Sequence, residues 1–144
     1  MRLNINRIFL IQLLYLSLAG ITALQKIIPL EIPNWFISKF EKTIGIIPFG
    51  IELSFIIITL LESAIASIIL ISIVKKEYRS ENNKSFLKLA LELSLILFLI
   101  LFFGSFLTMS YENGALDFIY FIGTLYVYQI IADKHKNQLI QIKT

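Results

Sequence analysis

The sequence predicts an all-α integral membrane protein: a four-helix bundle, with a short amphipathic helix lying in the membrane interface. Hydrophobic residues make up 57% of the 144 residues and charged residues only 16%, whereas a soluble domain is about half apolar and a quarter charged. Four apolar segments are long enough to cross a hydrocarbon core of about 30 Å. We therefore expect a single transmembrane domain over residues 1–144.

The first predicted span covers residues 8–24, a run of 17 residues without charge. A cleaved signal peptide is the alternative, because cleavage after Ala23 is tolerable. However, the apolar region exceeds the roughly 7–15 residues usual in signals, so we favour a retained helix. Polar and small residues recur at helical spacing and predict a face turned toward partner helices. These residues are Gln12, Tyr15, Ala19, Thr22, Ala23 and Lys26.

Residues 25–50 form the longest segment between spans and contain all three prolines. Within them, residues 34–44 place aromatic side chains, Trp35 and Phe36 among them, on one side and charged ones, such as Lys39, mostly on the other. This pattern predicts an amphipathic helix in the interface, with the tryptophan at headgroup level. A cap packed over the mouth of the bundle is a compatible interpretation.

The second predicted span, residues 51–74, is the segment around which we expect the bundle to be arranged. One carboxylate, Glu62, lies near the midpoint of these 24 residues. At about 100° per residue, Thr59, Ser63 and Ala66 share its side of the helix. Because an ionisable group facing lipid at mid-depth costs several kcal/mol, this side should face protein or water.

The third and fourth predicted spans cover residues 86–109 and about 115–132. In the third, Glu92 follows Lys88 by one helical turn, so a local ion pair explains it. One face of the fourth span gathers its polar and aromatic residues, which are Asp117, Tyr120, Phe121, Thr124 and Tyr128. Ten of the 13 basic residues fall in the N-terminus, the second loop with the first turn of the third span, and the C-terminal tail, which predicts that both termini are cytoplasmic.

Several chemistries are excluded by composition. The chain has no cysteine and one histidine, His135 in the polar tail, so a disulfide, an iron–sulfur cluster and a bis-histidine haem within one chain are excluded. The basic residues form no patch of the size that nucleic acid requires. The acidic residues of the spans lie at widely separated levels and lack the Glu-x-x-His spacing, so no metal site is predicted.

Glu62 is the candidate catalytic residue, as a buried protonatable group. Burial disfavours the charged form of a carboxylate unless a cation approaches, and a neutral acid can donate a hydrogen bond or pass a proton. An interhelical hydrogen bond that fixes packing is the alternative role. Lys26, Glu52 and Asp117 are candidate ligand-binding residues at one external level, where Lys26 could pair with Asp117 or Glu52; snorkelling to water is the alternative.

Tyr15 and Tyr120 complete the candidate ligand-binding set. Aromatic rings with a few polar groups suit a flat apolar ligand, such as a quinone or a sterol-like lipid. Tyrosines near the ends of spans are also common as simple interface anchors. No cofactor is predicted within the chain itself beyond such a bound quinone.

Three motifs carry a family resemblance: Ala23 to Ile27 before Pro29, Glu62 to the basic pair Lys75 and Lys76, and Asp117 to Leu125. Together they resemble the DoxX-like family of small four-span bacterial membrane proteins, which includes the small subunit of thiosulfate:quinone oxidoreductase. The resemblance implies a bacterial inner-membrane protein that is the membrane or quinone-facing subunit of an oxidoreductase.

Whether the chain is itself an enzyme stays open. Its expected partners are membrane lipids and an oxidoreductase subunit or a second copy of the chain, with no nucleic acid. Two alternatives stand beside the quinone-facing subunit. One is a non-catalytic assembly or anchoring protein, and the other is a small lipid-binding or carrier protein.

Overall fold

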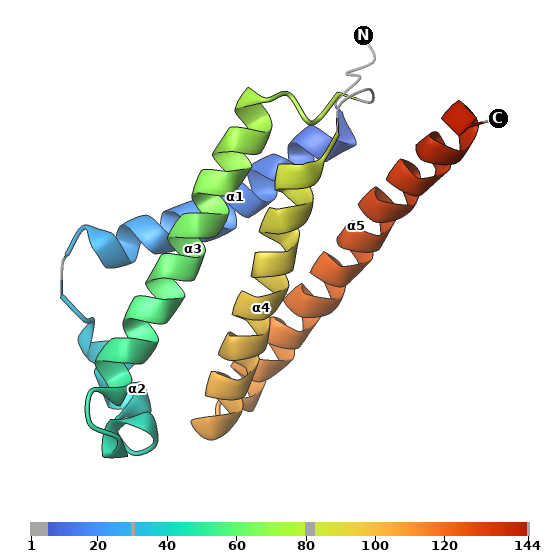
Figure 1. Ribbon diagram of the computed structural model, residues 1–144. Helices are drawn as coiled ribbons and strands as arrows, with labels where there is room; N and C mark the ends of the chain where they lie inside the picture. Colours follow the sequence, from blue (N-terminus) through green and yellow to red (C-terminus); the bar gives the residue numbers. More distant parts are fainter. Residues whose placement is uncertain (1–5, 30, 80–82, 144) are drawn as a thin grey trace, which may run out of the picture.

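Four long helices make up most of the computed structural model, which describes residues 6–29, 31–79 and 83–143, with side chains as far as Ala132 (Figure 1). The long helices are α1 (Arg7–Ile27), α3 (Gly50–Val74), α4 (Ser85–Leu107) and α5 (Tyr111–Lys143). Between α1 and α3 lie α2 (Asn34–Phe40) and the short 3₁₀ helix η1 (Ile44–Ile46). No strand occurs in the described ranges, so the predicted all-α four-helix fold is confirmed.

The four long helices are apolar enough to cross a membrane. The candidate spans are Arg7–Ile27, Gly50–Val74, Ser85–Leu107 and Tyr111–Ala132. Large hydrophobic side chains cover their outer surfaces, including Leu60, which is 64% exposed. A soluble monomer rarely exposes apolar surface on this scale, whereas lipid solvates it readily. The chain is therefore a multi-pass membrane protein.

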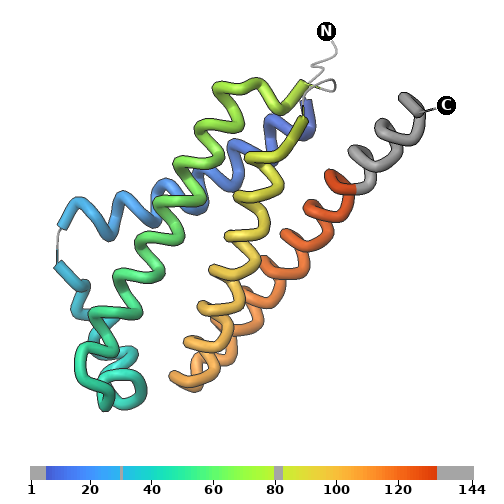
Figure 2. The backbone as a smooth tube through the Cα atoms, viewed as in Figure 1, coloured from blue at the N-terminus to red at the C-terminus, as the bar shows by residue number. Residues whose placement is uncertain are grey.

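Helix α3 is the centre of the bundle. It packs against α1 on one side and α4 on the other, while α5 packs against α4. Figure 2 shows α1 crossing α3 obliquely near the middle of α3. The buried residues of α1 are Gln12, Tyr15, Ala19 and Ala23. They belong to the predicted stripe, and small side chains in it allow the close approach of the two backbones.

Helix α2 covers one end of the bundle. Phe36 and Phe40 are buried, with ring centroids 4.7 Å apart, and Phe36 meets the ring of Phe55 on α3 at 5.3 Å. Trp35 is 59% exposed beside them. Gly50 begins α3 so close to η1 that an added Cβ would overlap the carbonyl oxygen of Ile44. Helix α2 therefore serves as a lid of aromatic residues at the start of α3.

A capped turn closes the opposite end of the bundle, between α3 and α4. Lys76 adopts the left-handed conformation with φ of 56°, and the amide of Glu77 donates to the carbonyl of Ser72 at 3.1 Å. These features define a Schellman turn. Glu77 then accepts hydrogen bonds from the amides of Phe86 and Leu87 at 3.1 and 2.9 Å. Its carboxylate thus caps the N-terminus of α4.

Candidate functional site

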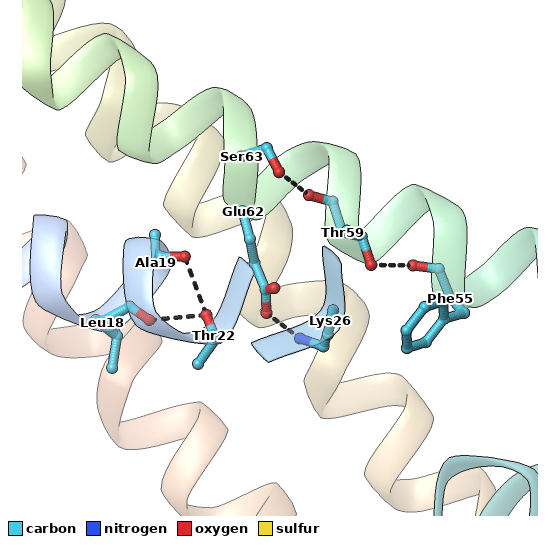
Figure 3. A network of polar contacts seen from close by, with 8 residues as sticks. All are labelled: Leu18, Ala19, Thr22, Lys26, Phe55, Thr59, Glu62 and Ser63. Carbon is cyan, nitrogen blue, oxygen red and sulfur yellow. Dashed lines mark hydrogen bonds and ion pairs between the residues drawn. The ribbon is translucent and has the colours of Figure 1, made fainter. Parts of the chain in front are cut away.

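The centre of the site is an ion pair between α1 and α3. Lys26 Nζ donates to Glu62 Oε1 at 2.5 Å (Figure 3). Glu62 is 4% exposed, and Lys26 belongs to the last turn of α1. The pair joins two charges deep in the apolar bundle, where each compensates the desolvation of the other.

This pairing corrects the expected level of Lys26. The sequence placed Lys26 beside Glu52 and Asp117, about ten residues or roughly 15 Å further along the bundle than Glu62. That expectation assumed that α1 runs parallel to the other spans. Because α1 crosses α3 obliquely near its middle, Lys26 reaches Glu62 instead.

The hydroxyl groups nearest the ion pair do not contact it. Thr22 donates to the carbonyls of Leu18 and Ala19 in its own helix, at 2.8 and 3.1 Å. Thr59 and Ser63 likewise donate to carbonyls four residues earlier, as Figure 3 shows. Glu62 Oε2 has no hydrogen-bond partner among the described residues. One carboxylate oxygen is therefore occupied by lysine and the other is open.

A small cavity is lined in part by Glu62, and we call it the Glu62 chamber. Its volume is about 120 Å³. All four span helices contribute to its wall, which consists of Tyr15, Leu18, Ala19, Thr22, Glu62, Ile65, Ser94, Leu97, Phe98, Leu101, Asp117 and Tyr120. The chamber therefore depends on the whole bundle and not on any one helix.

A larger cavity of about 510 Å³ adjoins the chamber beneath α2. Leu101, Asp117 and Tyr120 line both spaces. The wall of the larger cavity is mostly aliphatic and aromatic, and it includes Lys26 of the ion pair together with Trp35 and other α2 residues. Its volume lies within the range of about 300–1,000 Å³ that is typical of small-molecule sites. We call it the α2 cavity.

A third space, a groove of about 290 Å³, lies between α1 and α5. Tyr15, Leu18, Phe98 and Tyr120 line both this groove and the Glu62 chamber. Gly123 also lines the groove, and an added Cβ there would meet no atom within 4 Å. Tyr120 borders all three spaces and is stacked on Phe98, with ring centroids 5.5 Å apart.

No family model, curated protein or solved structure matches the chain. Within the described ranges, no three side chains of the metal-binding types gather closely enough to hold an ion. The charged groups that line the chamber and the α2 cavity are two carboxylates, Glu62 and Asp117, and two lysines, Lys26 and Lys39.

The structure brings five of the six predicted site residues together. Glu62, Asp117, Tyr15 and Tyr120 line the Glu62 chamber, and Lys26 reaches it through the ion pair. Ser105 donates to Asp117 Oδ2 at 2.9 Å, and the hydroxyls of Tyr15 and Thr124 are 2.7 Å apart. The sixth residue, Glu52, is exposed in the first turn of α3 and lines none of the three spaces.

The positions of two polar side chains differ from those that the sequence predicts. Glu92 accepts a hydrogen bond from the Tyr128 hydroxyl at 2.7 Å, which links α4 to α5, whereas the sequence suggested Lys88 as its partner. Lys39, expected on the polar side of α2, lines the α2 cavity. A long lysine side chain can bend round a helix, so the helical face alone does not fix where its ammonium lies.

The largest omission is the network around Glu77. Gln12 donates to the Ser72 hydroxyl at 2.7 Å, and Ser72 donates to Glu77 Oε2 at 2.7 Å. Glu77 is 3% exposed. The sequence placed it in a polar turn, and no local signal marks it, because the amides it caps are nine and ten residues away.

Proposed function

We propose that this chain is a DoxX-like subunit of the bacterial inner membrane that binds a quinone-type ligand for an oxidoreductase partner. The observation that carries the proposal is the α2 cavity, which is lined by Lys26 of the Lys26–Glu62 ion pair. An apolar cavity ending at a few polar groups is the usual form of a small-molecule site.

The wall of the α2 cavity suits a flat ring with an apolar tail. Phe36, Phe40 and Trp35 supply aromatic faces from α2, and Tyr120 supplies another from α5. Aromatic rings favour offset stacking or edge contacts with a planar ligand. The polar head of such a ligand would then lie toward Lys26, where the wall changes from apolar to charged.

Glu62 is the group that would exchange a proton with the ligand. Its Oε1 is held by Lys26, its Oε2 is buried without a protein partner, and the residue lines the Glu62 chamber. A quinone that gains or loses electrons also gains or loses protons, and a general acid or base must lie within hydrogen-bond reach of the oxygen. Glu62 lines the chamber that adjoins the α2 cavity, and its unpaired oxygen has the capacity to serve as that group.

Ligand binding can be tested with a short-chain benzoquinone and the full chain in lipid nanodiscs. Trp35 is the single tryptophan and lines the α2 cavity, so its fluorescence should be quenched as the cavity fills. Gly104→Leu should abolish quenching, because an added Cβ there makes ordinary 3.5 Å contacts with the Phe40 ring and the rest of the side chain would occupy the cavity.

Gly123→Leu is the matched control, because it fills the separate groove between α1 and α5. It should leave the quenching by the benzoquinone unchanged. Quenching that is lost in Gly123→Leu and kept in Gly104→Leu would place the ligand outside the α2 cavity. A wild-type protein that shows saturable quenching neither with the benzoquinone nor with its hydroquinone would refute the proposal.

The coupling to an oxidoreductase has its own test. Glu62→Gln should insert normally and remove the quinone-dependent oxidoreductase activity of membranes that contain the chain, whereas Glu52→Gln on the same helix should not. Normal activity in Glu62→Gln membranes with equal expression would remove Glu62 from the mechanism.

A non-catalytic assembly role is the second candidate. The observation that favours it is the apolar groove between α1 and α5, which a helix of another subunit could fill. In that case a cysteine placed at Gly123 should crosslink to a co-purifying protein, and the purified chain should bind no benzoquinone.

A further inference from the structure

We propose that the Glu62 chamber selects a ligand head that donates hydrogen bonds, and so takes the hydroquinone form of a quinone-type ligand in preference to the oxidised form. This inference deepens the proposed function and rests on it. It names the chemical form of the ligand from the donors and acceptors that line the chamber.

Glu62 lines the chamber and is 4% exposed, and its Oε2 is buried without a hydrogen-bond partner in the described structure. A buried acceptor on a charged group is costly when it is left unpaired. A donor placed in the chamber would remove that cost, whereas an acceptor would add repulsion.

Most hydroxyl hydrogens around the chamber already form hydrogen bonds within the protein. Thr22 donates to Leu18 and Ala19, and Ser94 donates to the carbonyl of Ala90 at 2.8 Å. These hydroxyls offer the chamber only lone pairs.

The Tyr15 hydroxyl is committed in the same way. Thr124 donates its single hydrogen to the carbonyl of Tyr120 at 2.7 Å. Tyr15 must therefore be the donor in its 2.7 Å contact with Thr124. The Tyr120 hydroxyl, which can donate or accept, is the flexible member of the wall.

The charge around the chamber also bears on which ligand head it accepts. Glu62 and Asp117 both line it, whereas Lys26 and Lys39 line the adjoining α2 cavity. Lys26 is paired with Glu62, and Asp117 accepts from Ser105. The chamber wall is thus rich in acceptors and carries carboxylate charge, which favours a donor in the ligand.

Size and shape narrow the choice of donor. A volume of about 120 Å³ exceeds the roughly 30 Å³ that one water occupies in the liquid. Phe98 and Tyr120 present stacked rings at 5.5 Å beside the chamber, which favours a flat aromatic head. A phenolic hydroxyl fits these features better than the aliphatic hydroxyl of a lipid such as diacylglycerol.

The test compares four probes under anaerobic conditions with the full chain in nanodiscs. The probes are a decyl-tailed benzohydroquinone, the matching benzoquinone, the dimethyl ether of the hydroquinone, and dioctanoylglycerol. The readout is the dissociation constant from Trp35 fluorescence or calorimetry. We expect the hydroquinone to bind at least about tenfold more tightly than each of the others, because a site built to pair a hydroxyl rejects analogues that lack it.

Variants assign the preference to the open oxygen. Glu62→Gln should reduce the preference for hydroquinone over quinone to about twofold or less, since its amide can donate as well as accept. Glu52→Gln, the same change on an exposed residue of α3, should keep the preference. If Glu62→Gln is poorly folded, the Lys26→Met/Glu62→Gln double variant makes the same test without leaving an unpaired lysine.

The outcomes separate this inference from the proposed function. Binding of quinone and hydroquinone with equal affinity, or tighter binding of the quinone or of dioctanoylglycerol, overturns the inference alone. A hydroquinone preference that persists in both Glu62 variants also overturns it. If neither the benzoquinone nor the benzohydroquinone binds to the wild-type chain, the proposed function fails and the inference fails with it.

Discussion

Two buried glutamates of this chain have opposite surroundings. Glu62 in the middle of α3 has one oxygen on Lys26 and the other open to a cavity. Glu77, just beyond the end of α3, accepts from Ser72 and from the amides of Phe86 and Leu87. The two are almost equally buried, at 4% and 3% exposure.

The difference shows how burial alone fails to identify a functional carboxylate. Glu77 is saturated by its own fold, and its charge lies at the N-terminus of α4, where a helix favours an anion. A carboxylate in that state has little capacity left for a ligand. Glu62 is held by a single cation and keeps capacity on the side that faces a cavity. Incomplete hydrogen bonding beside a cavity therefore distinguishes the candidate site from the structural cap.

The largest effect should come from breaking the ion pair. Lys26→Met leaves Glu62 without its cation, and the loss of one partner of a buried pair costs about 3–5 kcal/mol. We expect a loss of that size in the free energy of unfolding, measured by denaturation in detergent micelles.

The Lys26→Met/Glu62→Met double variant should recover most of that stability, because no charge is then left buried. Lys39→Met, which removes another lysine of the α2 cavity, is the control and should change stability by less than about 1 kcal/mol. Equal losses of stability in Lys26→Met and Lys39→Met would show that the ion pair has no special role.

A smaller loss is expected at the cap. Glu77→Ala leaves the Ser72 hydroxyl and two amides of α4 without their acceptor, at a cost of about 1–3 kcal/mol in stability. Affinity for the quinone-type probes should stay the same, because Glu77 lines neither the chamber nor the α2 cavity.

The exposed acid Glu31 provides the control for this change. Glu31→Ala should alter stability by no more than about 0.5 kcal/mol. A change in probe affinity in Glu77→Ala, with stability kept, would contradict the division between site and cap.

A still smaller effect separates packing from binding inside the chamber wall. Tyr15→Phe removes the hydrogen bond to Thr124 between α1 and α5, and such bonds within a membrane average about 0.6 kcal/mol. Thermal unfolding should show that modest loss, and the preference for hydroquinone should persist. Tyr126→Phe, at a residue that is 65% exposed, should be neutral. Loss of the preference in Tyr15→Phe would mean that its hydroxyl, and not only Glu62, recognises the ligand.

The smallest effect concerns the turns that follow α3 and α4. Lys76 and Met109 both have φ of 56°, but only the first turn is followed by a capping glutamate. Met109→Gly should stabilise the chain by about 0.5 kcal/mol, since relief of the left-handed conformation slightly exceeds the entropic cost of glycine. Met109→Ala should bring no gain in stability. Thermal unfolding of the two variants measures the difference.

Local pattern was enough to predict the helices and much of the candidate site. The face of α1 that contains Gln12, Tyr15, Ala19 and Ala23 was predicted from helical spacing and is the face that is buried. Glu62 was singled out because a charge in the middle of an apolar helix is expensive. Both are properties of single segments, so neither requires knowledge of how the segments pack.

The partners of these residues could not be predicted in the same way. Lys26 was placed at the wrong level because the oblique crossing of α1 depends on the side chains of α3 that meet it. Glu77 was overlooked because two of its donors, the amides of Phe86 and Leu87, belong to α4. A hydrogen bond of about 3 Å depends on the relative placement of two helices, and periodicity within one helix contains no such information.

The sequence by itself therefore determined that four helices cross a membrane and which faces they bury, since helix length and periodicity are local and the thickness of the bilayer is fixed. The tertiary structure alone decided that Lys26 meets Glu62, that one oxygen of Glu62 stays open to a chamber walled by all four spans, and that Glu77 caps α4. The physical reason is that charge pairing and cavities arise between helices, from crossings that many weak packing contacts set together.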